Sequence, residues 1–228
     1  MVGVIILFGG NSVIGNLVIE GLQVRTGKTE VYRVSRGSPS EETEDVVTGF
    51  FASPLSDGAI RMASHLVLSV GIPERQLLGI RASERLREIL EINVMKTIEF
   101  LELLEDRRRA LGVESNLLEI HLVSSILADF VKPGVVDYSL SKTILDTKVR
   151  QIYSPTGSSV KLFVWRFSFV SSPFHLPGEG RALSANPGQI RKRVSRAQQP
   201  GVRYVPRTGR FVGSALRLSP TLFGLISK

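Results

Sequence analysis

A short apolar run at residues 3–8 is followed directly by glycines and then by a helical pattern of apolar residues. The run reads Gly-Val-Ile-Ile-Leu-Phe and has no charged position. Continuous apolar strands of this kind are typical of parallel sheets that are covered by helices on both faces. The helical pattern begins near Ile14 and continues through Leu17, Val18 and Leu22. This segment therefore predicts a buried strand, a tight turn and a helix.

The alternation of strand and helix continues along the chain. Further strands are predicted at 29–35, 46–48, 65–70, 117–124, 159–167 and 202–205. Helices are predicted at 83–110, 137–153 and 187–198. A polar loop at 36–45 separates the second and third predicted strands, so we expect the crossover helix between them to be lost or reduced to a turn. Such alternation gives right-handed crossovers and a parallel sheet between helices. We expect an α/β, doubly wound, Rossmann-like sheet of about seven strands in a single domain spanning 1–228.

Composition narrows the classes of site that the chain can carry. The absence of cysteine excludes disulfides, thiol nucleophiles and thiolate zinc sites. His65, His121 and His175 are scattered along the sequence, so no metal site is expected. No apolar run approaches the roughly 18–20 residues that span a bilayer, and the N-terminus lacks the basic start of a signal peptide. We expect a cytoplasmic protein.

Positive charge is concentrated at the C-terminal end. Residues 181–228 contain ten of the 29 Lys and Arg residues and no Asp or Glu, whereas residues 1–180 contain 19 basic and 21 acidic residues. A basic segment favours an anionic partner such as a phosphate, an acidic membrane surface or a nucleic acid. A solvated basic surface that improves solubility is an equally good interpretation.

Glycines surround the point where the first predicted strand ends. The segment from Gly9 to Gly15 reads Gly-Gly-Asn-Ser-Val-Ile-Gly. A glycine turn at the start of a helix lets backbone N–H groups approach a phosphate, although such turns also occur for packing reasons. Arg36 follows the second predicted strand, where an Arg suits the 2′-phosphate of NADP(H) better than the ribose of NAD(H). An exposed loop arginine is the alternative interpretation of Arg36.

A serine, a tyrosine and a lysine mark the other end of the predicted sheet. Ser125 closes the strand at 117–124, and Tyr138 and Lys142 open the helix that follows. Positions i and i+4 share one face of a helix. An ammonium so close to a phenol is predicted to lower the pKa of the Tyr138 side chain, which would make Tyr138 a general acid and base near neutral pH.

These motifs resemble those of the short-chain dehydrogenases/reductases. That family has a Gly-xxx-Gly-x-Gly turn, a Tyr-xxx-Lys pair, a Ser about 13 residues before the Tyr, and an Asn in the long preceding helix, here Asn93. The resemblance implies an enzyme, a hydride-transferring oxidoreductase. It implies as catalytic residues Asn93, Ser125, Tyr138 and Lys142. It implies as cofactor-binding residues Gly9, Asn11, Ser12, Ile14, Gly15, Arg36, Gly71, Tyr138 and Lys142, with NADP(H) favoured over NAD(H).

The chain departs from the family pattern at four places. Val13 replaces the middle glycine, and Leu68-Ser69-Val70-Gly71 stands where the family has Asn-Asn-Ala-Gly. Phe167-Ser168 replaces the Pro-Gly after the sixth strand, and Gly49-Phe50 replaces the Asp that meets the adenine. These departures leave open a non-catalytic dinucleotide sensor or a nucleic-acid-binding regulator that uses the basic segment. The complete Asn, Ser, Tyr and Lys set favours the enzyme.

Four short segments of the chain are also similar to decaprenylphosphoryl-2-keto-ribose reductase-like members of this family. The similar segments are 7–15, 123–125, 202–206 and 217–223. This likeness implies a lipid-linked keto-sugar as the carbonyl substrate, with the segment Phe211–Lys228 at a membrane surface. The helices at 83–110 and 137–153 are more apolar than one sheet face requires, and in the family they pair. We therefore expect a homodimer or homotetramer with a small-molecule or lipid-linked substrate, and no nucleic acid partner.

Overall fold

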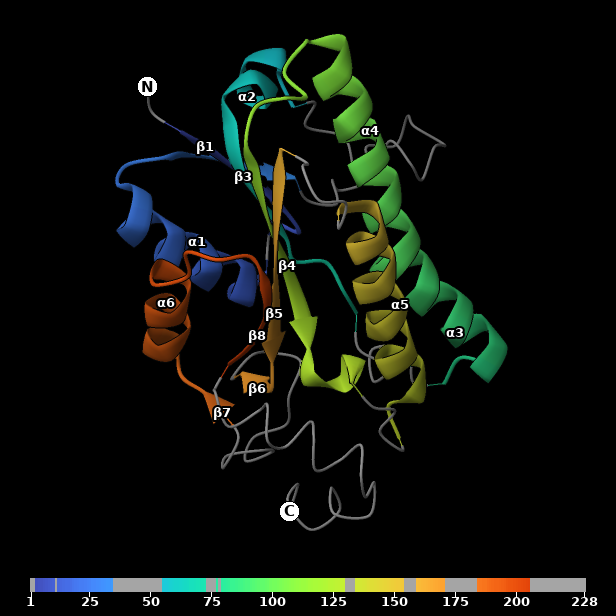
Figure 1. The fold of residues 1–228 in the computed structure, drawn as a ribbon. Coiled ribbons are helices and arrows are strands. Elements are labelled where there is room, and N and C mark those ends of the chain that lie inside the picture. Colours follow the sequence, from blue (N-terminus) through green and yellow to red (C-terminus); the bar gives the residue numbers. More distant parts are fainter. Residues whose placement is uncertain are drawn as a thin grey trace.

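A parallel sheet lies between two layers of helices (Figure 1). The computed structural model describes residues 3–10, 12–34, 55–72, 77, 79–129, 134–153, 159–170 and 184–205. Six strands are hydrogen-bonded in the order β2-β1-β3-β4-β5-β8. Their bounds are β1 Val4–Phe8, β2 Glu30–Val34, β3 Ala63–Leu68, β4 Leu118–Ser125, β5 Val160–Phe167 and β8 Gly201–Val205. A second, two-stranded sheet pairs β6 Phe169–Val170 with β7 Ser184–Ala185.

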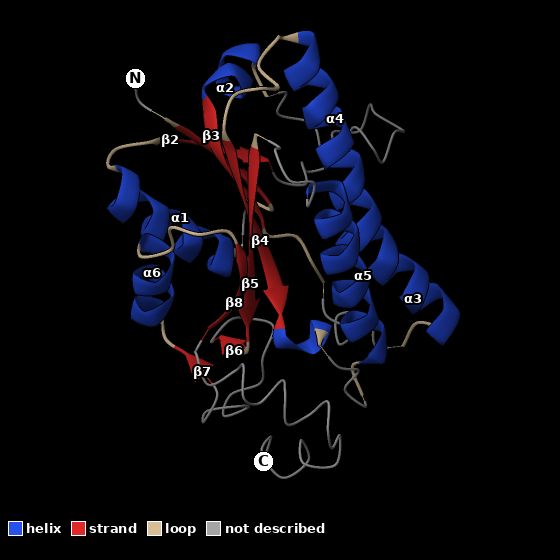
Figure 2. Ribbon diagram, in the orientation of Figure 1, coloured by secondary structure: helices blue, strands red, loops and turns tan. Residues whose placement is uncertain are grey.

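Helices cover both faces of the six-stranded sheet (Figure 2). One face carries α1 Val13–Thr26 and α6 Pro187–Ser195; the other carries α5 Val136–Tyr153 and a continuous helix formed by α3 Ala82–Leu90, the π-helical turn η3 Glu91–Met95 and α4 Lys96–Ala110. Two short helices complete the described elements, α2 Asp57–Met62 and the 3-10 turn η4 Ile126–Ala128. None of the described helices has the length and apolar character that crossing a membrane requires.

Strand β1, second from one edge of the six-stranded sheet, belongs to both halves of the core. All five of its residues are fully buried. Val4, Ile6 and Phe8 pack in the cluster under α4 and α5, and Ile5 and Leu7 pack in the cluster under α1 and α6. Alternate side chains of a strand point to opposite faces of a sheet, so a strand without a polar position can exist only between two apolar layers.

The helices α1 and α6 approach each other closely. A Cβ atom at Gly21 would lie 2.6 Å from Val194 Cβ, so glycine is needed where α6 crosses α1. Asn186 caps α6, because its side chain accepts from the Gln189 N–H while the Gln189 side chain accepts from the Asn186 N–H. This capping box fixes the start of α6, which leads the chain into the edge strand β8.

Most of the predicted elements are confirmed, with boundary shifts of one to three residues. The described residues include the predicted strands and helices at 3–8, 29–35, 65–70, 83–110, 117–124, 137–153, 159–167, 187–198 and 202–205. The predicted strand at 46–48 and the polar loop at 36–45 lie outside the described residues. Four described features were not predicted: the helix α2, the π-helical turn η3, the 3-10 turn η4 and the small β6–β7 sheet. The fold class, a Rossmann-like α/β sheet, is confirmed.

Candidate active site

The strand order creates a switch point at β1. The chain passes from β1 to β2 on one side of it and later to β3 on the other side. All neighbouring strands are parallel, so the segments that follow β1, β3, β4 and β5 gather at one edge of the sheet. Open α/β sheets bind their ligands at this edge, beside the switch point. Gly9, Gly71 and Ser125 all lie there.

The turn after β1 packs closely against the segment after β3. Gly9 has a φ of +98°, and a Cβ atom there would lie 2.4 Å from the Ser69 carbonyl oxygen. A Cβ atom at Gly15 would lie 2.9 Å from both Leu7 Cδ1 and Ser69 Cβ. The Ser12 hydroxyl accepts from the Gly15 N–H at 3.0 Å and lies 2.6 Å from Ser69 Oγ. Packing alone therefore requires glycine at both positions.

The first turn of α1 presents amide donors at the switch point. The first N–H groups of an α-helix have no partner within the helix. The Ser12 side chain accepts from Gly15, and the N–H groups of Val13 and Ile14 belong to the same turn. These donors and the positive helix end favour an anion.

Two of the predicted cofactor contacts, Asn11 and Arg36, lie outside the described residues. The nearest described arginine in the sequence is Arg33 in β2. Its Nη1 donates to Asn16 Oδ1 at 2.7 Å, so the side chain lies against α1. Sequence reasoning did not single out Arg33, because a charged residue inside a strand gives no local signal of where it points.

Lys142 reaches from α5 to the segment after β3. Its side chain is buried, and Nζ donates to the Val70 carbonyl oxygen at 3.1 Å. The same Nζ lies 5.5 Å from the centroid of the Tyr138 ring. A Cβ atom at Gly71 would lie 3.0 Å from Lys142 Nζ and 3.4 Å from Asn93 Oδ1. Four of the predicted site residues thus meet at one place.

Asn93 connects the segment after β3 to α5. It is fully buried within the π-helical turn η3. Its Oδ1 accepts from the Ile72 N–H at 2.7 Å, and its Nδ2 donates to the Ile72 carbonyl at 3.2 Å and to Ser141 Oγ at 3.0 Å. Single π-helical turns are frequent at functional sites. Here the turn carries the residue that fixes the position of the neighbouring loop.

The ionisation of Tyr138 differs from the sequence expectation. Lys142 was predicted to lower the pKa of the phenol, and that prediction is wrong for this structure. Burial, together with the carboxylate of Asp146, raises the pKa of Tyr138 to about 12. Burial also lowers the pKa of Lys142 to about 8, against the opposing effect of Asp146. Desolvation of the phenolate outweighs attraction to the ammonium, so near neutral pH Tyr138 is a protonated phenol that can donate a proton.

Ser125 lies at the same edge of the sheet but has different neighbours. It is the last residue of β4, and its Oγ accepts from the Leu127 N–H at 3.2 Å. This bond uses a lone pair and leaves the hydroxyl proton to be donated. Thr143 Oγ1 donates to the Ala128 carbonyl at 3.0 Å and so fixes η4 to α5, one residue beyond Lys142.

Sequence reasoning missed a buried ion cluster beside this site. Asp146 lies one helical turn beyond Lys142 on α5, and its Oδ2 accepts from Arg166 Nη2 at 3.0 Å. The sequence could have placed Asp146 beside Lys142, because Tyr138, Lys142 and Asp146 are spaced at i, i+4 and i+8 and therefore share one face of a helix. Arg166 could not be assigned to the cluster, because nothing in a strand sequence shows which helix it faces.

Two of the histidines, described above as scattered, are neighbours in the fold. His65 in β3 and His121 in β4 have ring centroids 5.8 Å apart, and with Glu119 they form a group of metal-ligating side chains in the described part of the chain. The parallel register of β3 and β4, which pairs His65 with Glu119, brings them together. The sequence interpretation was wrong to treat His65 and His121 as separate residues, because they lie together in the fold.

The hydrogen bonds of this group match a polar cluster better than a metal site. His121 Nδ1 accepts from Trp165 Nε1 at 3.1 Å, so the proton of the neutral ring is on Nε2, which faces Glu119 Oε2 at 3.5 Å. His65 Nε2 lies 2.9 Å from Arg25 Nη2, which also donates to Glu119. His65 Nε2 is thus occupied by Arg25, whereas His121 Nε2 makes no hydrogen bond of normal geometry. The cluster instead ties α1 to β3 and β4.

Comparison with known proteins supports the fold. The scan against protein-family models finds no match, and neither does the search of curated proteins. Among solved structures, a short chain dehydrogenase from Burkholderia cenocepacia in complex with NADP is similar, with a TM-score of 0.70 and 17% identity over 97% of this chain and 95% of that chain.

Two further solved structures are similar over most of their length. An alcohol dehydrogenase from Thermococcus sibiricus complexed with 5-hydroxy-NADP has a TM-score of 0.61 and 15% identity, over 90% of this chain and 96% of that one. A 3-oxoacyl-[acyl-carrier protein] reductase from Brucella melitensis in complex with NAD has a TM-score of 0.57 and 16% identity, over 76% of each chain. At these identities the likeness establishes the fold that the chain shares with them.

Proposed function

We propose that the protein is an NAD(P)H-dependent oxidoreductase that reduces a ketone to an alcohol, with Tyr138 as the general acid. The observation that carries this proposal is the pairing of the half-buried Tyr138 with the buried Lys142 on α5, with Lys142 Nζ 5.5 Å from the Tyr138 ring centroid. The pair lies at the edge of the sheet where such folds bind ligands. The solved structures that share the fold include complexes with NADP and with NAD.

The described residues fit a nicotinamide dinucleotide. The pyrophosphate would lie at the first turn of α1, beside the N–H groups of Val13 and Ile14 and the positive helix end. The N–H groups of Gly9, Gly10, Ser12 and Gly15 already donate within the protein, so these residues would shape the turn that approaches the pyrophosphate. The full proposed binding set is Gly9, Asn11, Ser12, Ile14, Gly15, Arg36, Gly71, Tyr138 and Lys142. When bound, the dinucleotide supplies the hydride. Arg36 supports NADP(H) over NAD(H), because a guanidinium suits a 2′-phosphate.

Each of the four proposed catalytic residues has one task. Lys142 would hold the ribose of the nicotinamide from its buried position, and Ser125 would donate its hydroxyl proton to the carbonyl oxygen of the substrate. Tyr138 is protonated near neutral pH and gives its proton to the same oxygen as negative charge develops there. Asn93 keeps the segment after β3 against α5. As in the family that the chain resembles, it would also hold a water that returns a proton through Lys142.

The finer proposal for the substrate is a keto-sugar on a lipid phosphate carrier. It rests on the sequence likeness of segments 7–15, 123–125, 202–206 and 217–223 to decaprenylphosphoryl-2-keto-ribose reductase-like proteins. The basic segment 181–228 would attract the phosphate of such a carrier or the surface of an anionic membrane. Residues 206–228 lie outside the described residues.

Substitution of Tyr138 by Phe tests the catalytic assignment. We expect Y138F to reduce carbonyl-dependent NADPH oxidation about 10²–10⁴-fold, because the proton donor is removed. Fluorescence titration with NADPH and with NADH should still show binding, because Y138F removes one hydroxyl and leaves the ring and the other residues of the proposed binding set in place. The acceptors should include simple ketones, keto-sugars and a keto-sugar on a polyprenyl phosphate.

A matched control lies on the same helix. Tyr153 is also buried on α5, and its hydroxyl donates to Glu105 at 3.3 Å, away from the proposed site. Y153F should keep the turnover of the unmodified protein. Equal turnover of Y138F and the unmodified protein would refute the role of Tyr138, and failure of both dinucleotides to bind would refute the oxidoreductase.

A further inference from the structure

Three ionisable residues of α5 form a row that begins at the half-buried Tyr138 and continues through two buried side chains past the proposed active site. Tyr138, Lys142 and Asp146 follow one another at intervals of four residues, so they lie on one face of the helix. Asp146 and Lys142 are 1% and 4% exposed. Charged side chains at such depth are stable only with counter-charges and hydrogen bonds. The partners of Asp146 therefore bear on the site.

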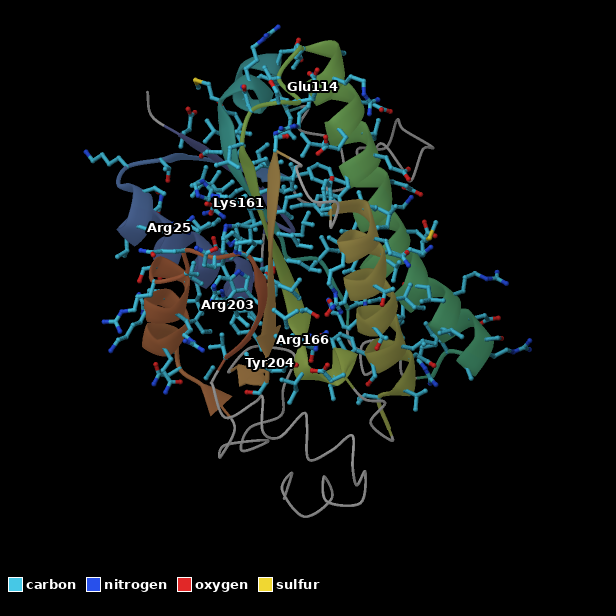
Figure 3. All side chains as sticks on the ribbon, viewed as in Figure 1. Arg25, Glu114, Lys161, Arg166, Arg203 and Tyr204 are labelled. Atoms are coloured by element: carbon cyan, nitrogen blue, oxygen red, sulfur yellow. The ribbon has the colours of Figure 1, made fainter. Side chains whose placement is uncertain are left out.

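Arg166 of β5 is the principal partner of Asp146. Its Nε and Nη2 both donate to Asp146 Oδ2, at 3.2 and 3.0 Å. The third nitrogen, Nη1, donates to Asp129, just after η4, and lies 3.0 Å from the Tyr204 hydroxyl of β8. Tyr204 in turn donates to Asp129 Oδ2 at 2.8 Å. Figure 3 shows Arg166 and Tyr204 together at the carboxyl end of the sheet.

The charges of this group balance only when Lys142 is included. Asp129 and Asp146 supply two negative charges, and Arg166 supplies one positive charge. The remaining negative charge belongs on the Asp146 side of the cluster, because Asp129 also receives the Tyr204 hydroxyl. Lys142, one helical turn from Asp146, supplies the fourth charge. A buried group of two cations and two anions is far less costly than three charges with an unpaired anion.

We propose that Asp146, kept ionised by Arg166, is a positioning residue that holds Lys142 as an ammonium and Tyr138 as a neutral phenol. A negative charge favours the protonated form of both neighbours, so it stabilises the pair in the state needed to reduce a carbonyl. Arg166 acts through Asp146, and Asp129 and Tyr204 act through Arg166. The proposal extends the proposed function, because it assigns the charge state of the same site to residues outside it.

The other charged groups around α5 are neutralised by their own partners. From α3, Arg85 donates to Asp137 at 2.9 Å. From η3 and α4, Lys96 pairs with Glu91 and Glu99 at 3.1 and 3.0 Å. Burial raises the pKa of Asp146, and Ser124 of β4, Arg166 and Arg150 oppose this shift by stabilising the carboxylate. In agreement with the geometry, Asp146 raises the pKa of both Lys142 and Tyr138, against the effect of burial on the pKa of Lys142.

The test is an NMR titration of lysine charge in the full chain. Lysine labelled with ¹³C at Cε reports protonation of each of the eight lysines, and K142M identifies the signal of Lys142. We expect a midpoint near the pKa of about 8 for Lys142 in the unmodified protein. In D146N the midpoint should fall by about one pH unit, the usual effect of losing an adjacent opposite charge.

Two more variants make the result specific. D129N removes the other carboxylate of the cluster, which contacts Arg166 and Tyr204, and should leave the midpoint within a few tenths of a pH unit of the unmodified value. D146N keeps Asp129 as the counter-ion of Arg166, so it should fold. Should it not fold, D146N/R166Q replaces the ion pair by two neutral amides and should give the same fall. An unchanged midpoint in the folded Asp146 variant, or an equal fall in D129N, overturns the proposal.

A second measurement separates this inference from the proposed function. The NMR midpoint needs neither cofactor nor substrate, so it stands or falls even if no carbonyl is reduced. If the protein is a reductase, the alkaline limb of NADPH oxidation against pH should move to lower pH in D146N and stay in place in D129N. A shifted midpoint with no reductase activity would refute the function and support the electrostatic role of Asp146. Turnover lost in Y138F, with the Lys142 midpoint unchanged in D146N, would support the proposed function and refute the electrostatic role of Asp146.

Discussion

Gly9 and Gly27 both have positive φ angles, yet their surroundings differ. A Cβ atom at Gly9 would lie 2.4 Å from the Ser69 carbonyl oxygen, whereas nothing lies within 4 Å of one at Gly27. Gly27→Ala should therefore cost only the backbone strain, about 1–3 kcal/mol. Gly9→Ala adds a steric overlap and should cost a further 1–3 kcal/mol or so. Urea unfolding of the two variants measures the difference, and equal losses would show that Gly9 is not closely packed.

Single residues also show how far the sequence could predict the site. The pairing of Tyr138 and Lys142 follows from their spacing, because positions i and i+4 share one face of a helix. Asn93 was assigned to the site only through the family resemblance. The protonation of Tyr138 could not be predicted in the same way. It depends on burial and on Asp146, and both arise from tertiary packing that no local pattern contains.

At the scale of elements, the polar cluster between α1, β3 and β4 should make stability depend on pH. The pKa of His65 is lowered to about 4, mainly by burial. The unfolded chain therefore takes up a proton near pH 6.5, before the folded protein does. The contribution of His65 is complete above pH 6.5 and is lost as the pH falls toward 4, at a cost of at most about 3 kcal/mol.

Urea unfolding between pH 8 and pH 4 measures this dependence. His65→Gln should unfold with a shallower loss of stability over the same range, because its side chain does not titrate. His121 is also buried with a lowered pKa, so part of the slope should remain in the variant. Identical slopes for the two proteins would contradict the assignment to His65.

The elements were easier to predict than their irregularities. The helix at 83–110 is present, because its apolar positions recur at helical spacing over many turns. The π-helical turn η3 within it was not predicted, since one extra residue in a turn barely disturbs that spacing. Its formation coincides with the three hydrogen bonds that Asn93 makes outside its own helix. The short α2 was missed because six residues are too few for a periodic pattern.

At the scale of the whole molecule, we propose a homodimer formed through α4 and α5. Several large apolar side chains on this layer are exposed. They are Met95, Leu103, Leu140 and Ile152, at 38–47% exposure. Single exposed apolar residues are common, but several on two neighbouring helices favour an interface.

Light scattering coupled to size-exclusion chromatography tests the assembly. The unmodified protein should have twice the 25.1 kDa mass of the chain. Leu103→Glu should reduce the mass toward that of a monomer, because it would bury a charge in the interface. Val24→Glu is the control, since Val24 is exposed on α1 on the opposite face of the sheet. A monomeric unmodified protein, or equal effects of both variants, would contradict this interface.

The central claim is that the edge of the sheet beside Tyr138 and Lys142 carries out hydride transfer to a carbonyl. Transfer of deuterium from NADPH deuterated at C4 to a ketone, followed by mass spectrometry of the alcohol, tests it most directly. We predict a deuterated alcohol with the unmodified protein and with Y153F, and none above background with Y138F. A protein that binds NADPH but leaves every ketone unlabelled, or Y138F that labels as well as the unmodified protein, would contradict the account.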